Sequence, residues 1–301
     1  MKRIIISISL ILTSICSFAQ SKIEGLGQFS FTSNDNKTIQ TWYYRPKNHS
    51  PNSNVLFVMH GTNRNAIDYR NNWINFAKRT GTLILAPEFS KENYPGSSGY
   101  HLGNIFNKDK TRNEVSLWTY TAIDMIFSHI QKITQTKQIH YDIYGHSAGA
   151  QFVHRMILFS ENSRIRTAIA ANAGWYTLPS DNVNFPYGLN RSPTTEIHMK
   201  ESLAKHLIIL LGEDDTDENH KYLRRSAEAM QQGKHRLNRG KYFFKTALDL
   251  SKKQDHVFNW ELRKVPYVGH SNRKMSAAAA LILEKKITQN HSERIYSHHQ
   301  E

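Results

Sequence analysis

Short, continuous apolar runs alternate along this chain with longer segments in which apolar residues recur at helical spacing. A continuous apolar run is typical of a parallel strand that is buried on both faces. The segments predicted to be strands of one sheet are residues 55–59, 83–86, 139–144, 167–171, 207–211 and 260–265. The predicted helices are residues 66–79, 117–133, 150–159 and 274–286, with helical segments within 223–233 and 240–250. This alternation predicts an α/β fold, in which helices cover both faces of a mostly parallel central sheet.

The remaining segments extend this picture. Residues 25–46 favour one or two antiparallel edge strands. Pro87 is expected to end the strand at 83–86, and residues 88–110 and 172–205 are expected to be mostly loop. No internal repeat or interdomain linker is visible, so we expect a single domain over residues 20–301, with a flexible tail from about residue 290.

The first residues are expected to be a signal peptide rather than part of the fold. A basic start at residues 2–3 precedes an apolar run at 4–15, and small residues stand at positions 17 and 19, where a signal peptidase requires them. We therefore expect a signal peptide over residues 1–19 and an exported protein, periplasmic or extracellular, with no stable membrane span after cleavage. The alternatives are an uncleaved anchor and lipid attachment at Cys16, although Ile15 stands where lipoprotein processing normally needs a small residue.

Cleavage would remove Cys16, which is the single cysteine of the chain. The mature protein would then have no disulfide and no cysteine-based nucleophile or metal site. No H-E-x-x-H motif or comparable cluster is present, so we expect neither a metal nor another cofactor. His298 and His299 belong to the terminal tail and are not expected to form a site.

The chain is strongly basic, with a formal net charge of +14. We do not expect nucleic-acid binding, because no binding motif occurs and the cations are scattered. Such a surface suits anionic surroundings, for example an acidic polysaccharide or the bacterial envelope. The alternative is a solvated basic surface that has no partner.

The segment Gly145-His146-Ser147-Ala148-Gly149 carries the candidate chemistry. It fits the G-x-S-x-G pattern, in which a sharp strand-to-helix turn exposes a serine hydroxyl. A predicted strand precedes it and a predicted helix follows, as the pattern requires. Ser147 is therefore a candidate nucleophile.

A serine nucleophile needs a base and a carboxylate that orients the base. His270 follows the last predicted strand, and Gly269 permits a tight turn there. The loop after the strand at 207–211 contains several acids, of which Asp215 is our choice and Asp214 the second candidate. The resulting order of serine, aspartate and histidine is the order found in α/β-hydrolases.

An oxyanion hole needs two N–H donors. One is predicted to be the backbone N–H of Ala148, the residue after the nucleophile. The other is predicted to be the backbone N–H of Thr62, in the loop after the strand at 55–59, where Gly61 permits a close approach.

Nearly all of the mature chain resembles bacterial α/β-hydrolases related to polyhydroxybutyrate depolymerases and feruloyl esterases. The segments that carry the resemblance are residues 59–65, 86–89, 144–152, 171–176, 211–216 and 265–270. The resemblance implies an α/β-hydrolase fold with a small cap or none, and the roles of nucleophile, acid and base for Ser147, Asp215 and His270. Secreted depolymerases differ in having disulfide cysteines and a separate polymer-binding domain.

We therefore predict an exported serine esterase that acts through an acyl-enzyme, with an acylated polysaccharide or a polyester as candidate substrates. Trp175 and Tyr176 are predicted to line an open acyl or sugar pocket, and ordinary core packing is the alternative. A peptidase or acyltransferase with the same triad, or an inactive hydrolase fold that serves as a binding protein, are the rival functions.

Overall fold

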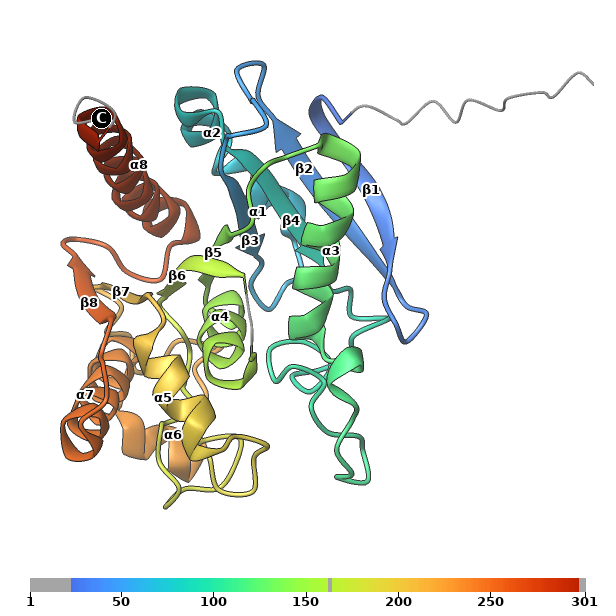
Figure 1. Cartoon of the computed structure of the whole chain (residues 1–301). Helices are drawn as coiled ribbons and strands as arrows, with labels where there is room; N and C mark the ends of the chain where they lie inside the picture. Colours follow the sequence, from blue (N-terminus) through green and yellow to red (C-terminus); the bar gives the residue numbers. More distant parts are fainter. Residues whose placement is uncertain (1–22, 162–163, 298–301) are drawn as a thin grey trace, which may run out of the picture.

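One sheet of eight strands forms the centre of the computed structural model, which describes residues 23–161 and 164–297 (Figure 1). The strands lie in the order β1-β2-β4-β3-β5-β6-β7-β8. The pairs β1–β2 and β2–β4 are antiparallel, and every other pair is parallel. Their bounds are β1 Gly25–Thr32, β2 Thr38–Arg45, β3 Val55–Met59, β4 Leu83–Glu88, β5 Tyr141–His146, β6 Ile165–Ala171, β7 Leu207–Gly212 and β8 Trp260–Val265.

Helices cover both faces of this sheet. One apolar core joins the sheet to α3, α4, α5 and α7, and a second core joins its other face to α1, α2 and α8. The predicted α/β fold with a mostly parallel sheet is confirmed. The bounds are α1 Ala66–Asn71, α2 Ile74–Thr80, α3 Thr119–Thr134, α4 Ala148–Phe159, α5 Glu196–Ala204, α6 Ala227–Gln232, α7 Arg236–Gln254 and α8 Asn272–Ser297, with a 3-10 turn at Val115–Leu117.

The strand predicted to end at Pro87 continues through it to Glu88. Pro87 has no N–H to donate, which excludes it from most positions between two strands. Strand β3 pairs with β4 only as far as Leu85, whereas β2 pairs with β4 up to Glu88. Pro87 therefore lies opposite Thr41 of β2, beyond the last residue of β4 that pairs with β3.

Three helical predictions also differ from the structure. The helix predicted at 66–79 is divided into α1 and α2 at a tight turn, where the Trp73 N–H donates to the Arg70 carbonyl. Helix α5 lies in a region predicted to be mostly loop, because it has no clear apolar face, and a capping box of Thr195 and His198 marks its start. The last helix, predicted to end at 286, continues to Ser297.

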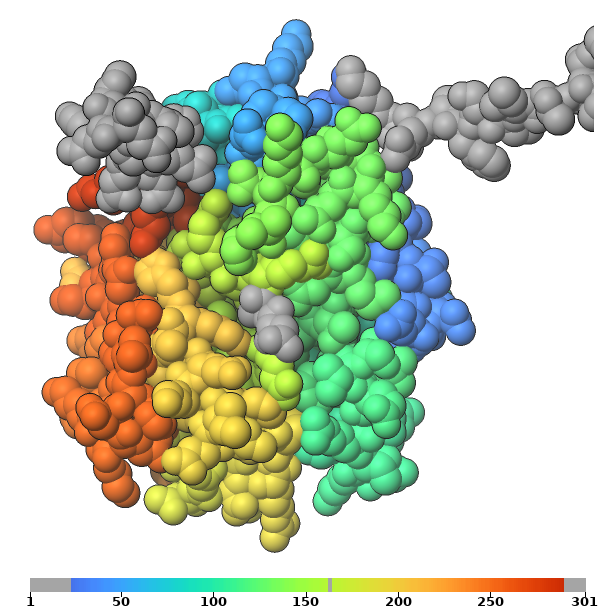
Figure 2. All heavy atoms as spheres, in the orientation of Figure 1, coloured from blue at the N-terminus to red at the C-terminus, as the bar shows by residue number. Residues whose placement is uncertain are grey.

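The parallel strands all end at one edge of the sheet. The segments that follow β3, β5, β7 and β8 contain the candidate site residues, and the carboxyl ends of parallel strands are where active sites form in such folds. Between β6 and α5 the structure has turns and one isolated bridge, with no helix or strand of a separate cap. The N-terminal strands (blue) and the C-terminal elements (orange to red) lie on opposite sides of the molecule, as the strand order requires (Figure 2).

The predicted signal peptide over residues 1–19 and the histidines at 298 and 299 lie outside the described residues. Within residues 23–161 and 164–297, none of the helices has both the length and the hydropathy needed to cross a membrane.

Candidate active site

A strained turn holds Ser147 between β5 and α4. Its φ of 58° and ψ of −114° are unusual for a residue with a side chain, and such strain typically costs about 1–3 kcal/mol. The two glycines permit the turn, because a Cβ on Gly149 would lie 2.1 Å from the Met59 carbonyl oxygen and one on Gly145 would lie 2.2 Å from the Gly149 carbonyl oxygen. The predicted strand-turn-helix unit is therefore present, with Ser147 half-buried at its apex.

Hydrogen bonds connect Ser147, His270 and Asp215. The Ser147 Oγ lies 3.1 Å from His270 Nε2, and His270 Nδ1 lies 2.7 Å from Asp215 Oδ2. Because the carboxylate accepts from Nδ1–H, Nε2 is left free to accept the proton of the serine hydroxyl. The structure thus brings together the three residues that sequence reasoning selected.

The two candidate acids occupy different environments. Asp215 is 2% exposed and faces His270, whereas its neighbour Asp214 is exposed. The backbone also fixes this loop, because the Asp214 N–H donates to Val268 and the Asp215 N–H donates to Gly212. Only Asp215 of these two aspartates contacts the histidine.

Asn172, at the end of β6, joins the acid loop to the histidine loop. Its Oδ1 accepts from the Gly212 N–H at 2.8 Å, and its Nδ2 donates to the Gly269 carbonyl at 3.1 Å. Asn172 has a φ of 50°, a left-handed conformation that asparagine tolerates better than most residues. Sequence reasoning placed Asn172 at the start of a loop and gave it no role, because no motif predicts a bridge between residues so far apart.

Two further histidines flank the ring of His270. The rings of His146 and His270 are 4.6 Å apart, and those of His220 and His270 are 5.4 Å apart in an edge-on arrangement. Burial lowers the pKa of His146 well below its ordinary value, and nearby positive groups add to this effect. Burial, with Arg236 and His270 nearby, also lowers the pKa of His220. Both rings are therefore neutral at neutral pH.

The loop after β3 lies against the turn that holds Ser147. Gly61 is buried, and a Cβ there would lie 2.6 Å from the Tyr69 hydroxyl. The Arg64 guanidinium also fixes the loop, by donating to the carbonyls of residues 89, 94 and 96. Thr62 is exposed at this position, and Ala148 begins α4 directly after Ser147. That the backbone N–H groups of Thr62 and Ala148 form the oxyanion hole stays a prediction.

Trp175 and Tyr176 are both buried. Tyr176 has no exposed surface, and its ring stacks on Phe243 with centroids 4.5 Å apart. Trp175 is 5% exposed, packs on Tyr187 at 4.6 Å and lies under the Arg155 guanidinium at 4.1 Å. Both residues thus show the core packing that was the alternative to an open pocket. Contact of Trp175 or Tyr176 with a substrate stays a prediction.

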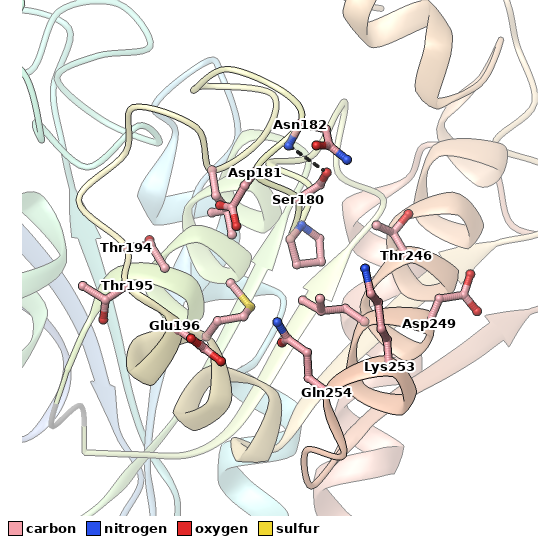
Figure 3. Close-up of a pocket in the computed structure, with 14 residues that line it drawn as sticks. Ser180, Asp181, Asn182, Thr194, Thr195, Glu196, Thr246, Asp249, Lys253 and Gln254 are labelled. Atoms are coloured by element: carbon pink, nitrogen blue, oxygen red, sulfur yellow. Dashed lines mark hydrogen bonds between the residues drawn. The ribbon is translucent and has the colours of Figure 1, made fainter.

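Two sizeable cavities lie apart from Ser147. The one shown in Figure 3, of about 490 Å³, is formed by residues 179–182, the start of α5 and the last turns of α7. The other, of about 590 Å³, lies between residues 98–110 and 184–191. Neither is lined by Ser147, His270 or Asp215. Within the described part of the chain, no group of three or more histidine, cysteine, aspartate or glutamate side chains is placed to hold a metal ion.

The chain is similar to several solved structures of hydrolases. It is 40% identical to poly(aspartic acid) hydrolase-1 from Sphingomonas sp. KT-1, over 85% of this chain and 97% of that one, with a TM-score of 0.84. It is 33% identical to LpqC, the poly(3-hydroxybutyrate) depolymerase from Bordetella parapertussis, over 86% of this chain and 89% of that one, with a TM-score of 0.82. An S-formylglutathione hydrolase from Agrobacterium tumefaciens, 14% identical over 87% of this chain and 94% of that one with a TM-score of 0.59, shares the fold.

No protein-family model matches the chain, and a search of curated proteins finds no match.

Proposed function

This chain belongs to the bacterial α/β-hydrolases related to polyhydroxybutyrate depolymerases and is an ester hydrolase, and we propose that Ser147, His270 and Asp215 are its catalytic triad. The observation that carries this proposal is the pair of hydrogen bonds that connects the three side chains, at 3.1 and 2.7 Å. Nucleophile and base within bonding reach, with the base oriented by a third group, is the geometry that acyl transfer requires.

The proposed reaction has two halves. In the first, Ser147 Oγ attacks the ester carbonyl while His270 Nε2 takes the hydroxyl proton, which it then gives to the departing alcohol. In the second, water attacks the acyl-serine, His270 takes a proton from the water and returns it to Ser147, and the carboxylic acid leaves. The backbone N–H groups of Ala148 and Thr62 are proposed to stabilise the oxyanion in both halves.

The proposed substrate is an acylated polysaccharide or a polyester outside the cytoplasm. Two features support a substrate too large to be enclosed. Ser147 and His270 are only half-buried, and the chain has no separate cap between β6 and α5. Export through the signal peptide at residues 1–19 would bring the enzyme to such a polymer, and the mass of the mature N-terminus tests this, with Gln20 expected as the first residue.

A second candidate is cleavage of amide bonds in an anionic polymer by the same triad. The similarity to a poly(aspartic acid) hydrolase, at 40% identity over 97% of that chain, favours it. The net charge of +14 also favours it, because a basic surface attracts a polyanion.

A substrate panel tests both candidates. It contains esters of increasing chain length, aromatic esters, sugar acetates, polyhydroxybutyrate and poly(aspartic acid), each measured with the wild-type enzyme and with Ser147→Ala. We expect ester hydrolysis that falls by several powers of ten in the variant. Release of aspartyl fragments faster than any ester would favour the second candidate, and full activity of the Ser147→Ala enzyme would refute the assigned triad.

A further inference from the structure

Arg236 contacts the side of Asp215 that His270 does not use. Its Nη1 lies 3.3 Å from Asp215 Oδ1, while Asp215 Oδ2 faces His270 Nδ1 at 2.7 Å. Arg236 is 1% exposed and Asp215 is 2% exposed, so the pair is shielded from water. The two oxygens of one carboxylate are thus divided between a guanidinium and the histidine.

The same guanidinium also holds His220. Arg236 Nη2 donates to His220 Nδ1 at 3.0 Å, and the His220 ring meets the His270 ring edge-on, with an angle of 67° between their planes. Arg236 therefore fixes two groups that both touch His270.

Arg236 occupies an electrostatically unfavourable place in its helix. Arg236 is the first residue of α7, where the helix dipole disfavours a positive charge by about 0.3–1 kcal/mol. Burial of the guanidinium is a further cost, since desolvation lowers the pKa of Arg236, and Asp215 opposes that shift. The next residue, Leu237, donates its backbone N–H to the Asp215 carbonyl at 3.3 Å, so the start of α7 is attached to the acid loop twice.

We propose that Arg236 is a positioning residue of the hydrolytic site, which holds the Asp215 carboxylate and the His220 ring in the orientation that His270 needs. This inference rests on the proposed triad. No sequence motif indicates it, because Arg236 begins α7, the second helix after the acid loop, 21 residues from Asp215.

The proposal has an electrostatic consequence. The imidazolium that forms on His270 during each half of the reaction is stabilised by Asp215 and opposed by the positive charge of Arg236. Two further titratable groups lie nearby: Asp217, close to Arg236 and His220, and His146, which is neutral and whose ring centroid lies 4.6 Å from that of His270. Without the guanidinium charge this opposition is lost, and we expect activity on the acid side to be lost at a higher pH.

The test is the pH profile of kcat/KM for Arg236→Gln and for a matched variant, Arg239→Gln. Arg239 lies one turn further along α7 and is equally buried, but it donates to the backbone carbonyls of Gly174, Gly233 and Arg224 instead of to Asp215. We expect the acid limb of Arg236→Gln to move up by about 0.5–1 pH unit. Its kcat should be about tenfold lower, because the Asp215 carboxylate is no longer held in place. The acid limb of Arg239→Gln is expected to stay in place.

An unmoved acid limb in Arg236→Gln, or an equal shift in Arg239→Gln, would overturn the proposal. If Arg236→Gln does not fold, Arg236→Lys decides, because its ammonium keeps the charge but lacks the planar fork whose two nitrogens hold Asp215 and His220 separately. Its kcat should fall several-fold with KM unchanged, and a wild-type kcat would overturn the proposal. Labelling of Ser147 by a fluorophosphonate in the wild-type enzyme separates failure of this proposal from failure of the proposed triad. Absence of labelling would refute the triad itself.

Discussion

Two neighbouring aspartates show how strongly single positions differ in this site. Asp215 is buried between His270 and Arg236, whereas Asp214 points to solvent from the same loop. The carboxylate of Asp215 can orient the histidine and stabilise its charged form, and the carboxylate of Asp214 can do neither.

Replacement of each aspartate by asparagine should therefore separate them. We expect Asp215→Asn to lower kcat by about 10⁴, because an amide favours the wrong tautomer of His270. Asp214→Asn is the matched control and should stay within about twofold of the wild type, as substitutions at exposed sites usually do. Steady-state kinetics on one ester measures both, and a larger loss in Asp214→Asn than in Asp215→Asn would contradict the assignment.

The residues found from sequence and those missed differ in one respect. Ser147 and His270 are marked by local signals, a glycine-flanked turn and a glycine after the last strand. Arg236 and Asn172 act through partners tens of residues away, and no local pattern announces such contacts. The sequence predicts substrate contact for Tyr176. It could not reveal that Tyr176 stacks on Phe243, because that contact depends on the position of α7, which a single sequence does not give.

Among the elements, the ends of β6, β7 and β8 must keep a fixed spacing for the site to work. Asn172 provides it by accepting from Gly212 and donating to Gly269. Because Gly269 immediately precedes His270, a displacement here is transmitted to the catalytic base. A misplacement of about 1 Å at an active site can lower the rate a hundredfold.

We expect Asn172→Asp to lower kcat about ten- to a hundredfold, because a carboxylate cannot donate to the Gly269 carbonyl and repels it. Its free energy of unfolding should fall by about 1–3 kcal/mol. Asn190→Asp is the control, since Asn190 makes a similar amide contact with Asn184 in an exposed loop. Kinetics and chemical denaturation measure the two effects, and a destabilised Asn172→Asp enzyme with wild-type kcat would limit Asn172 to a structural role.

The buried strands were the most predictable elements, because a five-residue apolar run such as β3 is typical of a parallel strand buried on both faces. Elements that depend on their neighbours were less so. Helix α5 has little apolar periodicity, and β4 continues through Pro87 at positions where it pairs with β2 but no longer with β3. Such features follow from the packing of several elements and carry no local signal.

For the whole molecule, buried neutral histidines link stability to pH. His154 donates from Nδ1 to the Ala150 carbonyl, and its Nε2 accepts from the Thr177 N–H, so a proton on Nε2 would break the second bond. His60 has the same arrangement with Gly61 and Phe89, and burial lowers its pKa to about 3. Burial also lowers the pKa of His154 well below its ordinary value.

The free energy of unfolding should therefore fall as the pH falls from 7 to 5. In this range the unfolded chain binds protons at histidines, with a pKa near 6.5, and the folded chain does not bind them at these sites. Each such histidine should contribute a loss of about 2 kcal/mol. Urea denaturation at several pH values measures the slope, and His154→Gln should have a shallower slope than the wild type. An identical slope in this variant would show that His154 is not responsible.

The assembled account depends on one serine in one strained turn. Reaction with a fluorophosphonate, followed by intact-mass measurement and peptide mapping, tests it most directly. We expect a single adduct on Ser147, no adduct in Ser147→Ala, and labelling of His270→Ala that is slower by orders of magnitude, because the hydroxyl then lacks its base. An adduct on any other residue, or equal labelling of the Ser147→Ala enzyme, would contradict the account.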